Sequence, residues 1–377
     1  MVLLVLILIV PSLLIAWIAC GVARTLSLRA GAVDTAPMPG QVKAPSRGIP
    51  NTGGIGIASA VFMPMIAGLI AINFMTAEQL PSWATPVGEH LEGLRAVQPM
   101  GWAMVVGGLW LHALGLIDDR RPLGPVLKLA AMVLPALVLA AFFDVRLLTL
   151  IDRYPAGRWL SIAITILWFL VVTNAMNFID NMDGLCAGVT AVAGSMFLAA
   201  VLLGGQWFVA AILALLVGAA LGFLIWNRPP AKLFMGDSGS LVIGYLLAFA
   251  TIRTTYIQAE TISPWYAVFM PLVVLAVPLY DLVSVTLIRL SQGKSPMVGD
   301  LQHFSHRLVE RGLSKRTTVS LIVALSGITG VSGLLLTRTN TNWQAIAIGG
   351  QVALMLAIIG LFENRSIAKA GDKHTNG

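Results

Sequence analysis

Residues 207–226, WFVAAILALLVGAALGFLIW, form an unbroken apolar run without a charged side chain. A helix of roughly 20 such residues is long enough to cross the hydrocarbon core of a bilayer. The chain as a whole has this character, since 57% of its 377 residues are hydrophobic and only 11% are charged. Soluble proteins carry about 25% charged residues. The sequence therefore predicts an all-α, polytopic membrane protein.

Apolar runs separated by short charged clusters divide the chain into eleven expected spans. These are 1–23, 54–75, 100–117, 126–143, 159–177, 185–203, 207–226, 239–252, 266–288, 318–337 and 343–362. Together they predict one transmembrane domain over residues 1–362, followed by a flexible cytoplasmic tail at 363–377. The first run lacks the basic flank and cleavage pattern of a secretory signal, so we interpret it as a membrane helix. Cys20 and Cys186 suggest neither a disulfide framework nor a zinc site.

The lysines and arginines are distributed unevenly between alternate loops. The set of loops that includes the C-terminal tail holds 18 of them, and the opposite set holds 6. Cytoplasmic loops carry the excess of Lys and Arg in membrane proteins. We therefore expect an outside N-terminus, a cytoplasmic C-terminus and a location in the inner (plasma) membrane. On this interpretation the net charge of +7 reflects membrane orientation and does not indicate nucleic-acid binding.

The polar segment after the quoted run is 227–240, NRPPAKLFMGDSGS, in which Asp237 lies between glycines just before the next apolar run. Glycine lets a backbone approach a phosphate closely, and the start of a helix presents free N–H groups to an anion. A carboxylate there would repel phosphate unless a hard cation such as Mg²⁺ lay between them. Asp237 is therefore a candidate metal ligand, with an ordinary helix N-cap as the alternative.

A second polar segment, 174–185, reads NAMNFIDNMDGL, and its Asn174, Asn177, Asp180 and Asp183 recur every three residues. Three-residue spacing keeps side chains near one face of a helical turn. Two carboxylates and two amides at a membrane boundary need a metal, a donor-rich ligand or shared protons. The segment is a candidate binding site, and a solvated turn between two helices is the alternative.

A third segment, DDRRPLGPVLK, runs from Asp118 to Lys128. Neighbouring side chains on a helix diverge, so Asp118 and Asp119 are expected to have separate tasks. One could face a metal or an attacking phosphate while the other holds a cation or a helix end. The adjacent arginines leave an ordinary charged cap as the alternative.

Two further segments carry positive charge. His303, His306 and Arg307 form the sequence HFSHR and precede more basic residues, which suits the binding of a diphosphate or of anionic lipid headgroups. Lys43 belongs to a Gly- and Pro-rich stretch, 43–54, that leads into the second span. All five segments fall on the predicted cytoplasmic side. One shared site is the simplest interpretation.

In order and spacing, these motifs resemble the polyprenyl-phosphate N-acetylhexosamine-1-phosphate transferase superfamily, glycosyltransferase family 4. This family includes undecaprenyl-phosphate GlcNAc-1-phosphate transferases and the phospho-MurNAc-pentapeptide transferase of peptidoglycan synthesis. The resemblance covers roughly residues 30–316, through DDxxxLxxxxK, NxxNxxDxxDGL, NxxPAxxFMGDxGS and the His-containing loop. It implies attack of a lipid phosphate on the β-phosphate of a UDP-sugar, with release of UMP, as the first membrane step of cell-envelope polysaccharide synthesis.

The resemblance also implies roles for individual residues. Asp237 would hold Mg²⁺ (or Mn²⁺), and Asp118, Asp119, Asp180 and Asp183 would lie at the catalytic centre. Substrate would be bound by the following residues: Lys43, Lys128, Asn174, Asn177, Asn227, Phe234, His303, His306 and Arg307. The expected partners are a polyprenyl-phosphate lipid, a UDP-sugar and the membrane, and a homodimer stays open.

The chain departs from the family pattern in its His loop. GlcNAc-type members often show H-x-H-H-R, whereas here Ser305 replaces one histidine. The triple-His loop of the MurNAc-pentapeptide enzymes is absent, which disfavours a peptidoglycan role and favours a GlcNAc-like donor. An ion-coupled transporter is the competing hypothesis, but transporters usually place charges near the bilayer midplane and show repeated halves. A scaffold without activity is disfavoured because the core acids are present.

Overall fold

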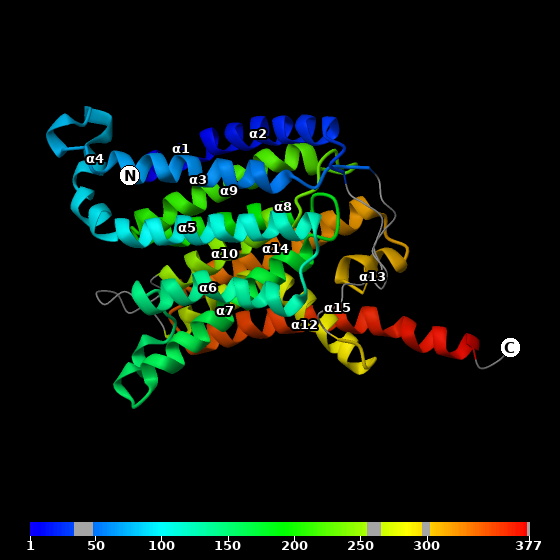
Figure 1. The fold of residues 1–377 in the computed structure, drawn as a ribbon. Helices are drawn as coiled ribbons and strands as arrows, with labels where there is room; N and C mark the ends of the chain where they lie inside the picture. The colour runs from blue at the N-terminus through cyan, green and yellow to red at the C-terminus, as the bar shows by residue number, and fades with distance from the viewer. Residues whose placement is uncertain (34–47, 255–264, 296–301, 375–377) are drawn as a thin grey trace.

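The computed structural model describes residues 1–33, 48–254, 265–295 and 302–374, and every regular element within these ranges is a helix. Lys43 lies outside the described residues. The longer helices run roughly parallel and antiparallel in one bundle (Figure 1). The α-helices, long and short, have the following bounds: α1 Val2–Ile7, α2 Ile9–Arg29, α3 Gly53–Ala71, α4 Thr85–Gly88, α5 Leu91–Arg120, α6 Pro125–Phe142, α7 Gly157–Ile179, α8 Leu185–Leu203, α9 Trp207–Asn227, α10 Asp237–Arg253, α11 Met270–Val274, α12 Ala276–Ser291, α13 Phe304–Glu310, α14 Lys315–Leu336 and α15 Asn342–His374.

The prediction of a polytopic, all-helical membrane protein is confirmed. Within the described residues, 9 helices are long and apolar enough to cross a membrane, or 10 with one bent pair. The pair corresponds to the expected span 266–288, where Tyr266–Val274 and Ala276–Ser291 meet at an angle of 69°. A bend of this size is typical of a broken span or of a re-entrant loop. The remaining expected span, 239–252, lies within α10, which has 17 residues.

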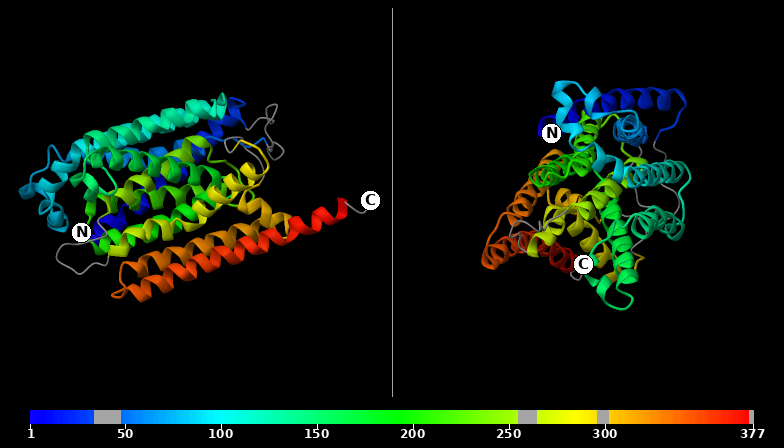
Figure 2. Two further views of the ribbon diagram at one scale, coloured as in Figure 1. Left: turned by 90° about the horizontal axis from the view of Figure 1, so that it is seen from below. Right: turned by 90° about the vertical axis from the view of Figure 1, so that its left-hand side faces the viewer.

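Helix α10 lies at the centre of the bundle. Every side chain from Ser238 to Thr251 is buried, and the helix packs against α3, α5, α7 and α9. The end-on view shows it surrounded by other helices (Figure 2, right). Close packing relies on small residues, as expected between membrane helices. A side chain at Gly115 of α5, for example, would collide with the backbone at Ser238.

The chain termini lie at opposite ends of the bundle in both side views (Figures 1 and 2). The end that faces the C-terminus gathers the last turns of α5 and α7, the first turn of α10 and the short helix α13 (Figure 1). Four polar segments that are far apart in the sequence thus meet at one end of the molecule. Which side of a membrane this end faces stays a prediction from the Lys and Arg distribution, as does the tail boundary at residue 363.

Candidate active site

Lys128, in the first turn of α6, joins two of the predicted acids. Its ammonium group donates to Oδ2 of Asp118 at 3.0 Å and also contacts Oδ2 of Asp237. The three side chains are between 14% and 25% exposed, so the pairing is partly shielded from water. Carboxylates from α5 and α10 therefore share one cation from α6.

Asn177 holds the other oxygen of Asp237. Its Nδ2 atom donates to Oδ1 of Asp237 at 2.8 Å and to the hydroxyl of Ser240 at 2.9 Å. Both oxygens of Asp237 are thus oriented by groups from two other helices, α6 and α7. The Asn177 side chain also shows that α7 contributes directly to this cluster.

Asp119 has a different environment from its neighbour Asp118. Its oxygens accept the backbone N–H groups of Asp237 at 3.0 Å and Ser238 at 3.3 Å, so it caps the start of α10. Gly236, just before α10, has a φ of +71°, and a Cβ there would lie 2.5 Å from the Asn51 carbonyl oxygen and from Asp119. The expectation of separate tasks for the two aspartates fits this geometry.

Asp180 lies just beyond the end of α7, near the same carboxylates. Burial raises the pKa of Asp180 well above its ordinary value, and the charges of Asp237, Asp119 and Asp183 raise it further. Helix α7 ends at Ile179, so the three-residue repeat does not continue along one helical face. The repeat was expected to share a face, but the chain turns before its last two members are reached.

Other polar residues of the segments 174–185 and 227–240 form hydrogen bonds within the protein itself. Asp183 accepts the N–H of Ala231 at 2.9 Å. Asn227 is 3% exposed, accepts the N–H of Gly184 at 2.7 Å and donates to the Leu233 carbonyl at 2.9 Å. These contacts tie the loop before α8 to the loop before α10.

Two further predicted residues have backbone partners. Asn174 donates to the Leu170 carbonyl of its own helix at 2.8 Å. The backbone of Phe234 bonds to Pro50 at 2.8 Å and to Gly53 at 2.9 Å, which fixes the loop before α10 against the start of α3. The proposed substrate contacts of Asn174, Asn227 and Phe234 stay predictions.

The His loop is anchored by α12. Asp281, which is 1% exposed, accepts hydrogen bonds from Nδ1 of His303 at 2.9 Å and from the backbone N–H of Phe304 at 2.6 Å. Because Nδ1 of His303 donates its hydrogen to this carboxylate, the Nε2 atom of the ring is left to bind another partner. The ring also contacts the edge of Phe178, with centroids 5.3 Å apart. This contact links the loop to the end of α7.

Ser305 and His306 follow in the same loop. The Ser305 hydroxyl, buried where GlcNAc-type members have a histidine, donates to Oδ1 of Asn181. Burial lowers the pKa of His306 below its usual 6.5, and the nearby charge of His303 lowers it further. His306 is therefore expected to be neutral at pH 7. Helix α13 is thus held by α12, through Asp281, and by the loop after α7, through Asn181.

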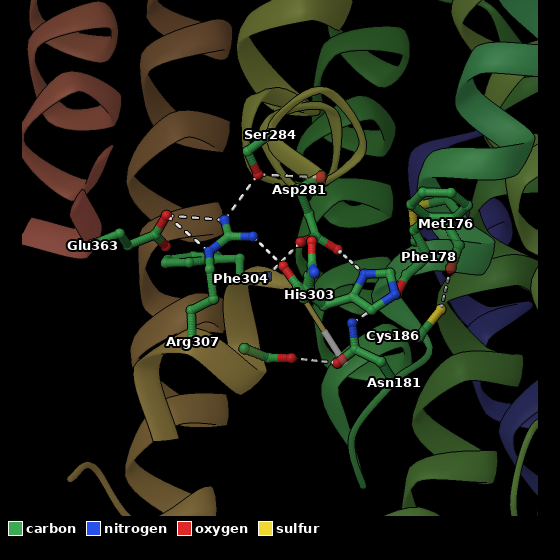
Figure 3. A network of polar contacts seen from close by, with 12 residues as sticks. Met176, Phe178, Asn181, Cys186, Asp281, Ser284, His303, Phe304, Arg307 and Glu363 are labelled. Carbon is green, nitrogen blue, oxygen red and sulfur yellow. Dashed lines mark hydrogen bonds and ion pairs between the residues drawn. The ribbon is translucent and has the colours of Figure 1, made fainter. Parts of the chain in front are cut away.

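Arg307 is held by protein groups (Figure 3). Its guanidinium donates to Glu363 of α15 at 3.0 Å and to Ser284 of α12 at 2.8 Å, and it contacts the Gln302 carbonyl. A phosphate-binding role for Arg307 stays a prediction, since its donors already have protein acceptors here.

The cluster suits a divalent cation in one respect. Within the described ranges, no group of three His, Cys, Asp or Glu side chains forms a ready-made metal site. Mg²⁺, however, usually binds one or two carboxylates together with substrate phosphates and water. Burial is the main reason for the raised pKa of Asp180, and the charges of Asp237, Asp119 and Asp183 add to it; a cation beside these carboxylates would relieve that repulsion.

The sequence interpretation missed three residues that shape this end of the molecule: Asn181, Asp281 and Glu363. Asn181 lay within a recognised motif but out of its three-residue phase. Asp281 and Glu363 are isolated acids in or at the edge of apolar spans. Such acids are rare in membrane helices and usually face the interior, which is the signal that could have found them.

Comparison with known proteins identifies the family. The model of glycosyl transferase family 4 matches residues 101–255. The decaprenyl-phosphate N-acetylglucosaminephosphotransferase of Mycolicibacterium smegmatis is 32% identical over 370 residues, covering 92% of this chain and 85% of that protein. A probable undecaprenyl-phosphate N-acetylglucosaminyl 1-phosphate transferase of Bacillus subtilis is 29% identical over 93% of this chain and 89% of its own length. The undecaprenyl-phosphate alpha-N-acetylglucosaminyl 1-phosphate transferase of Escherichia coli K12 is 29% identical over 59% of this chain and 62% of its own length. The chain belongs to glycosyl transferase family 4.

Proposed function

We propose that this protein transfers N-acetylhexosamine-1-phosphate, with GlcNAc as the favoured sugar, from a UDP-sugar to undecaprenyl phosphate. An oxygen of the lipid phosphate attacks the β-phosphorus of the UDP-sugar. The bond from that phosphorus to the oxygen bridging the two phosphates breaks, and UMP leaves. The product is a lipid-linked diphosphate sugar, at the first membrane step of a cell-envelope polysaccharide.

The observation that carries this proposal is the meeting of Asp118, Lys128, Asn177 and Asp237 at one end of the bundle. A transfer between a membrane lipid and a water-soluble nucleotide needs its polar site at such an end. The carboxylates come from the last turn of α5 and the first turn of α10. A transporter would instead be expected to place them near the middle of its spans.

The proposed roles follow from the contacts. Asp237 and Asp118 would hold Mg²⁺, which when bound neutralises charge on the diphosphate. Lys128, now shared by these two carboxylates, is the cation that can turn to a phosphate oxygen. Asp119 fixes the first turn of α10 through two backbone N–H groups. Asn177 orients Asp237 from the side of α7.

Little proton transfer is required of the protein. A phosphate monoester has its second pKa near 6, so the lipid phosphate is mostly dianionic at neutral pH. Positioning and charge stabilisation should then supply most of the rate acceleration. With the site at the predicted cytoplasmic end, the nucleotide-sugar would enter from the cytoplasm and the lipid from the inner membrane leaflet.

A panel of UDP-sugars tests the proposal. Purified protein is incubated with undecaprenyl phosphate, Mg²⁺ and each donor, and UMP and lipid-linked product are both measured. UDP-GlcNAc is expected to give product, EDTA to abolish it, and Asp237→Asn to reduce it at least a hundredfold, the loss typical of one electrostatic group at a transition state. If the folded protein makes lipid-linked product from no donor in the panel, the proposal is wrong.

A further inference from the structure

Helix α15 carries one charged residue in the stretch 342–363, and that residue is Glu363. The helix lies at the edge of the bundle (Figure 2, left), and only 6% of its apolar window is buried. Glu363 nevertheless is 8% exposed and faces the other helices. A buried carboxylate is unfavourable unless it is paired. Its position on an otherwise lipid-facing helix therefore calls for a specific partner.

That partner is Arg307 of the His loop. Oε2 of Glu363 accepts a hydrogen bond from Nε of Arg307 at 3.0 Å and forms an ion pair with Nη2 at 2.9 Å, so that two guanidinium nitrogens meet one carboxylate oxygen in a two-pronged contact. The hydroxyl of Tyr280 on α12 donates to the same oxygen at 3.0 Å. Figure 3 shows Arg307 lying between Glu363 on one side and Ser284 on the other. The acid of α15 is therefore joined to α12 and α13 at once.

The remaining donors of Arg307 also bind protein. Nη2 donates to the hydroxyl of Ser284 at 2.8 Å, and Nη1 contacts the carbonyl of Gln302, which precedes His303 in the chain. All three guanidinium nitrogens are thus used within the His loop and its supports. This arrangement makes Arg307 part of the loop's own framework.

Helix α13 has only seven residues. It packs against α14 and α12, and two polar contacts anchor its start: Asp281 at His303 and Asn181 at Ser305. Arg307 lies one turn beyond His303 and directly follows His306. A short helix of this kind depends on tertiary contacts for its position. The contact between Arg307 and Glu363 of α15 is the third polar anchor of this helix.

We propose that Glu363 is a positioning residue, which acts through Arg307 to fix His303 and His306 for the phosphosugar transfer. Arg307 serves as the clamp between α13 and α15 and does not bind the substrate phosphates. For its kinetic consequences, the inference rests on the function proposed above. Its structural content, that Glu363 orders the His loop, is independent of the reaction.

A double-mutant cycle tests the inference. Glu363→Ala, Arg307→Ala and the double variant are compared in kcat/KM for the UDP-sugar, with Gln351→Ala on the exposed face of α15 as the control. Each single variant is expected to lose tenfold or more, as partners of active-site side chains commonly do, by about 10–100-fold. Because both remove the same clamp, the double variant is expected within about threefold of either single one. Losses that multiply in the double variant would overturn the proposal, since Arg307 would then act without Glu363.

A second measurement does not require activity. Amide hydrogen exchange over residues 303–310 is expected to become at least tenfold faster in Glu363→Ala and to stay unchanged in Gln351→Ala. Arg307→Lys keeps the charge but loses the planar two-pronged contact, so an intermediate rate is expected. Unchanged exchange in Glu363→Ala would refute the clamp. Failure of the wild-type protein to transfer phosphosugar would refute the proposed function and leave the exchange result to decide the clamp.

Discussion

The replacement Lys128→Met tests the centre of the site most sharply. It removes the ammonium group and leaves an unbranched, apolar side chain of similar length. Asp118 would retain the N–H of Leu123 at 2.6 Å, and Asp237 would retain Asn177 at 2.8 Å. The two carboxylates that share Lys128 would lose their common cation. We expect both a less stable protein and a slower reaction.

The magnitude follows from the contacts. A hydrogen bond to a charged group contributes about 1.5–3 kcal/mol, and Lys128 makes two. Breaking a buried pair from one side costs roughly 3–5 kcal/mol. The lower end of this range, about 3 kcal/mol, is appropriate here because the three side chains are 14–25% exposed to solvent. This cost applies to the stability of the protein. For a contact of similar strength between Lys128 and the transferred phosphate, a loss of about 3 kcal/mol in the transition state corresponds to roughly a hundredfold fall in kcat/KM, at about 1.4 kcal/mol for each factor of ten.

The assay measures initial rates of UMP release in detergent or nanodiscs, together with the melting temperature. The matched control is Lys232→Met, because Lys232 is an exposed lysine at the same end of the bundle, and among the described residues the ion pairs of Asp118 and Asp237 are made by Lys128 and not by Lys232. The control is expected to keep kcat/KM within about threefold of wild type. Should Lys128→Met be folded and retain a third or more of the wild-type kcat/KM, the reasoning about this cluster is wrong.

Three further variants probe other parts of the account. Ser305→His restores the H-x-H-H-R pattern that GlcNAc-type members often show, yet it should lower activity. Ser305 is 1% exposed, and an oversized side chain at a buried position costs about 1–3 kcal/mol. A kcat/KM equal to that of wild type would contradict this expectation. Gly236→Ala should lower the melting temperature and activity, because its Cβ would collide at 2.5 Å. Gly205→Ala, with a similar positive φ but no atom closer than 3.9 Å, should lower the melting temperature less, through backbone strain alone; equal effects would refute the collision. Hydrogen bonds from Arg146 lower the pKa of Asp152, so this carboxylate stabilises the fold above its unfolded pKa near 4. The melting-temperature difference between wild type and Asp152→Asn should therefore shrink as the pH falls from 7 towards 3, and a difference that grows would contradict the pairing.

Apolar patterning predicted most of the fold. A run without charges has few alternatives to a helix in lipid, so the positions of the spans follow from residues such as those of 207–226. The bend between Val274 and Ala276 was not predicted, although the sequence holds a signal for it. Pro278 has no N–H to donate to the carbonyl of Val274, four residues earlier, and a proline inside an apolar run breaks or bends a helix at such a point.

The site was predicted in part. Residue chemistry and spacing indicated that Asp118, Lys128, Asn177 and Asp237 share one cluster, and their contacts bring these four side chains together. The division of tasks between Asp118 and Asp119 needed the structure, since only the position of α10 shows which of them caps a helix. Three-residue spacing is meaningful only while the helix continues, and α7 ends before Asp180 is reached.

The partners of the His loop could not be read from the sequence. Asp281 and Glu363 lie 22 and 56 residues from the side chains that they bind. No local pattern connects an acid in one apolar helix to a basic loop elsewhere. Ser305 illustrates the same limit, because its partner Asn181 lies 124 residues away in the sequence.

The central claim is that a sugar leaves its nucleotide together with one phosphate. A UDP-GlcNAc labelled with ³²P in the β-phosphate tests this directly, with undecaprenyl phosphate as the acceptor and Mg²⁺ present. The account predicts that the label appears in the lipid product and that unlabelled UMP is released in equal amount. Release of labelled UDP with unlabelled lipid product would show transfer of the sugar alone and would contradict the account.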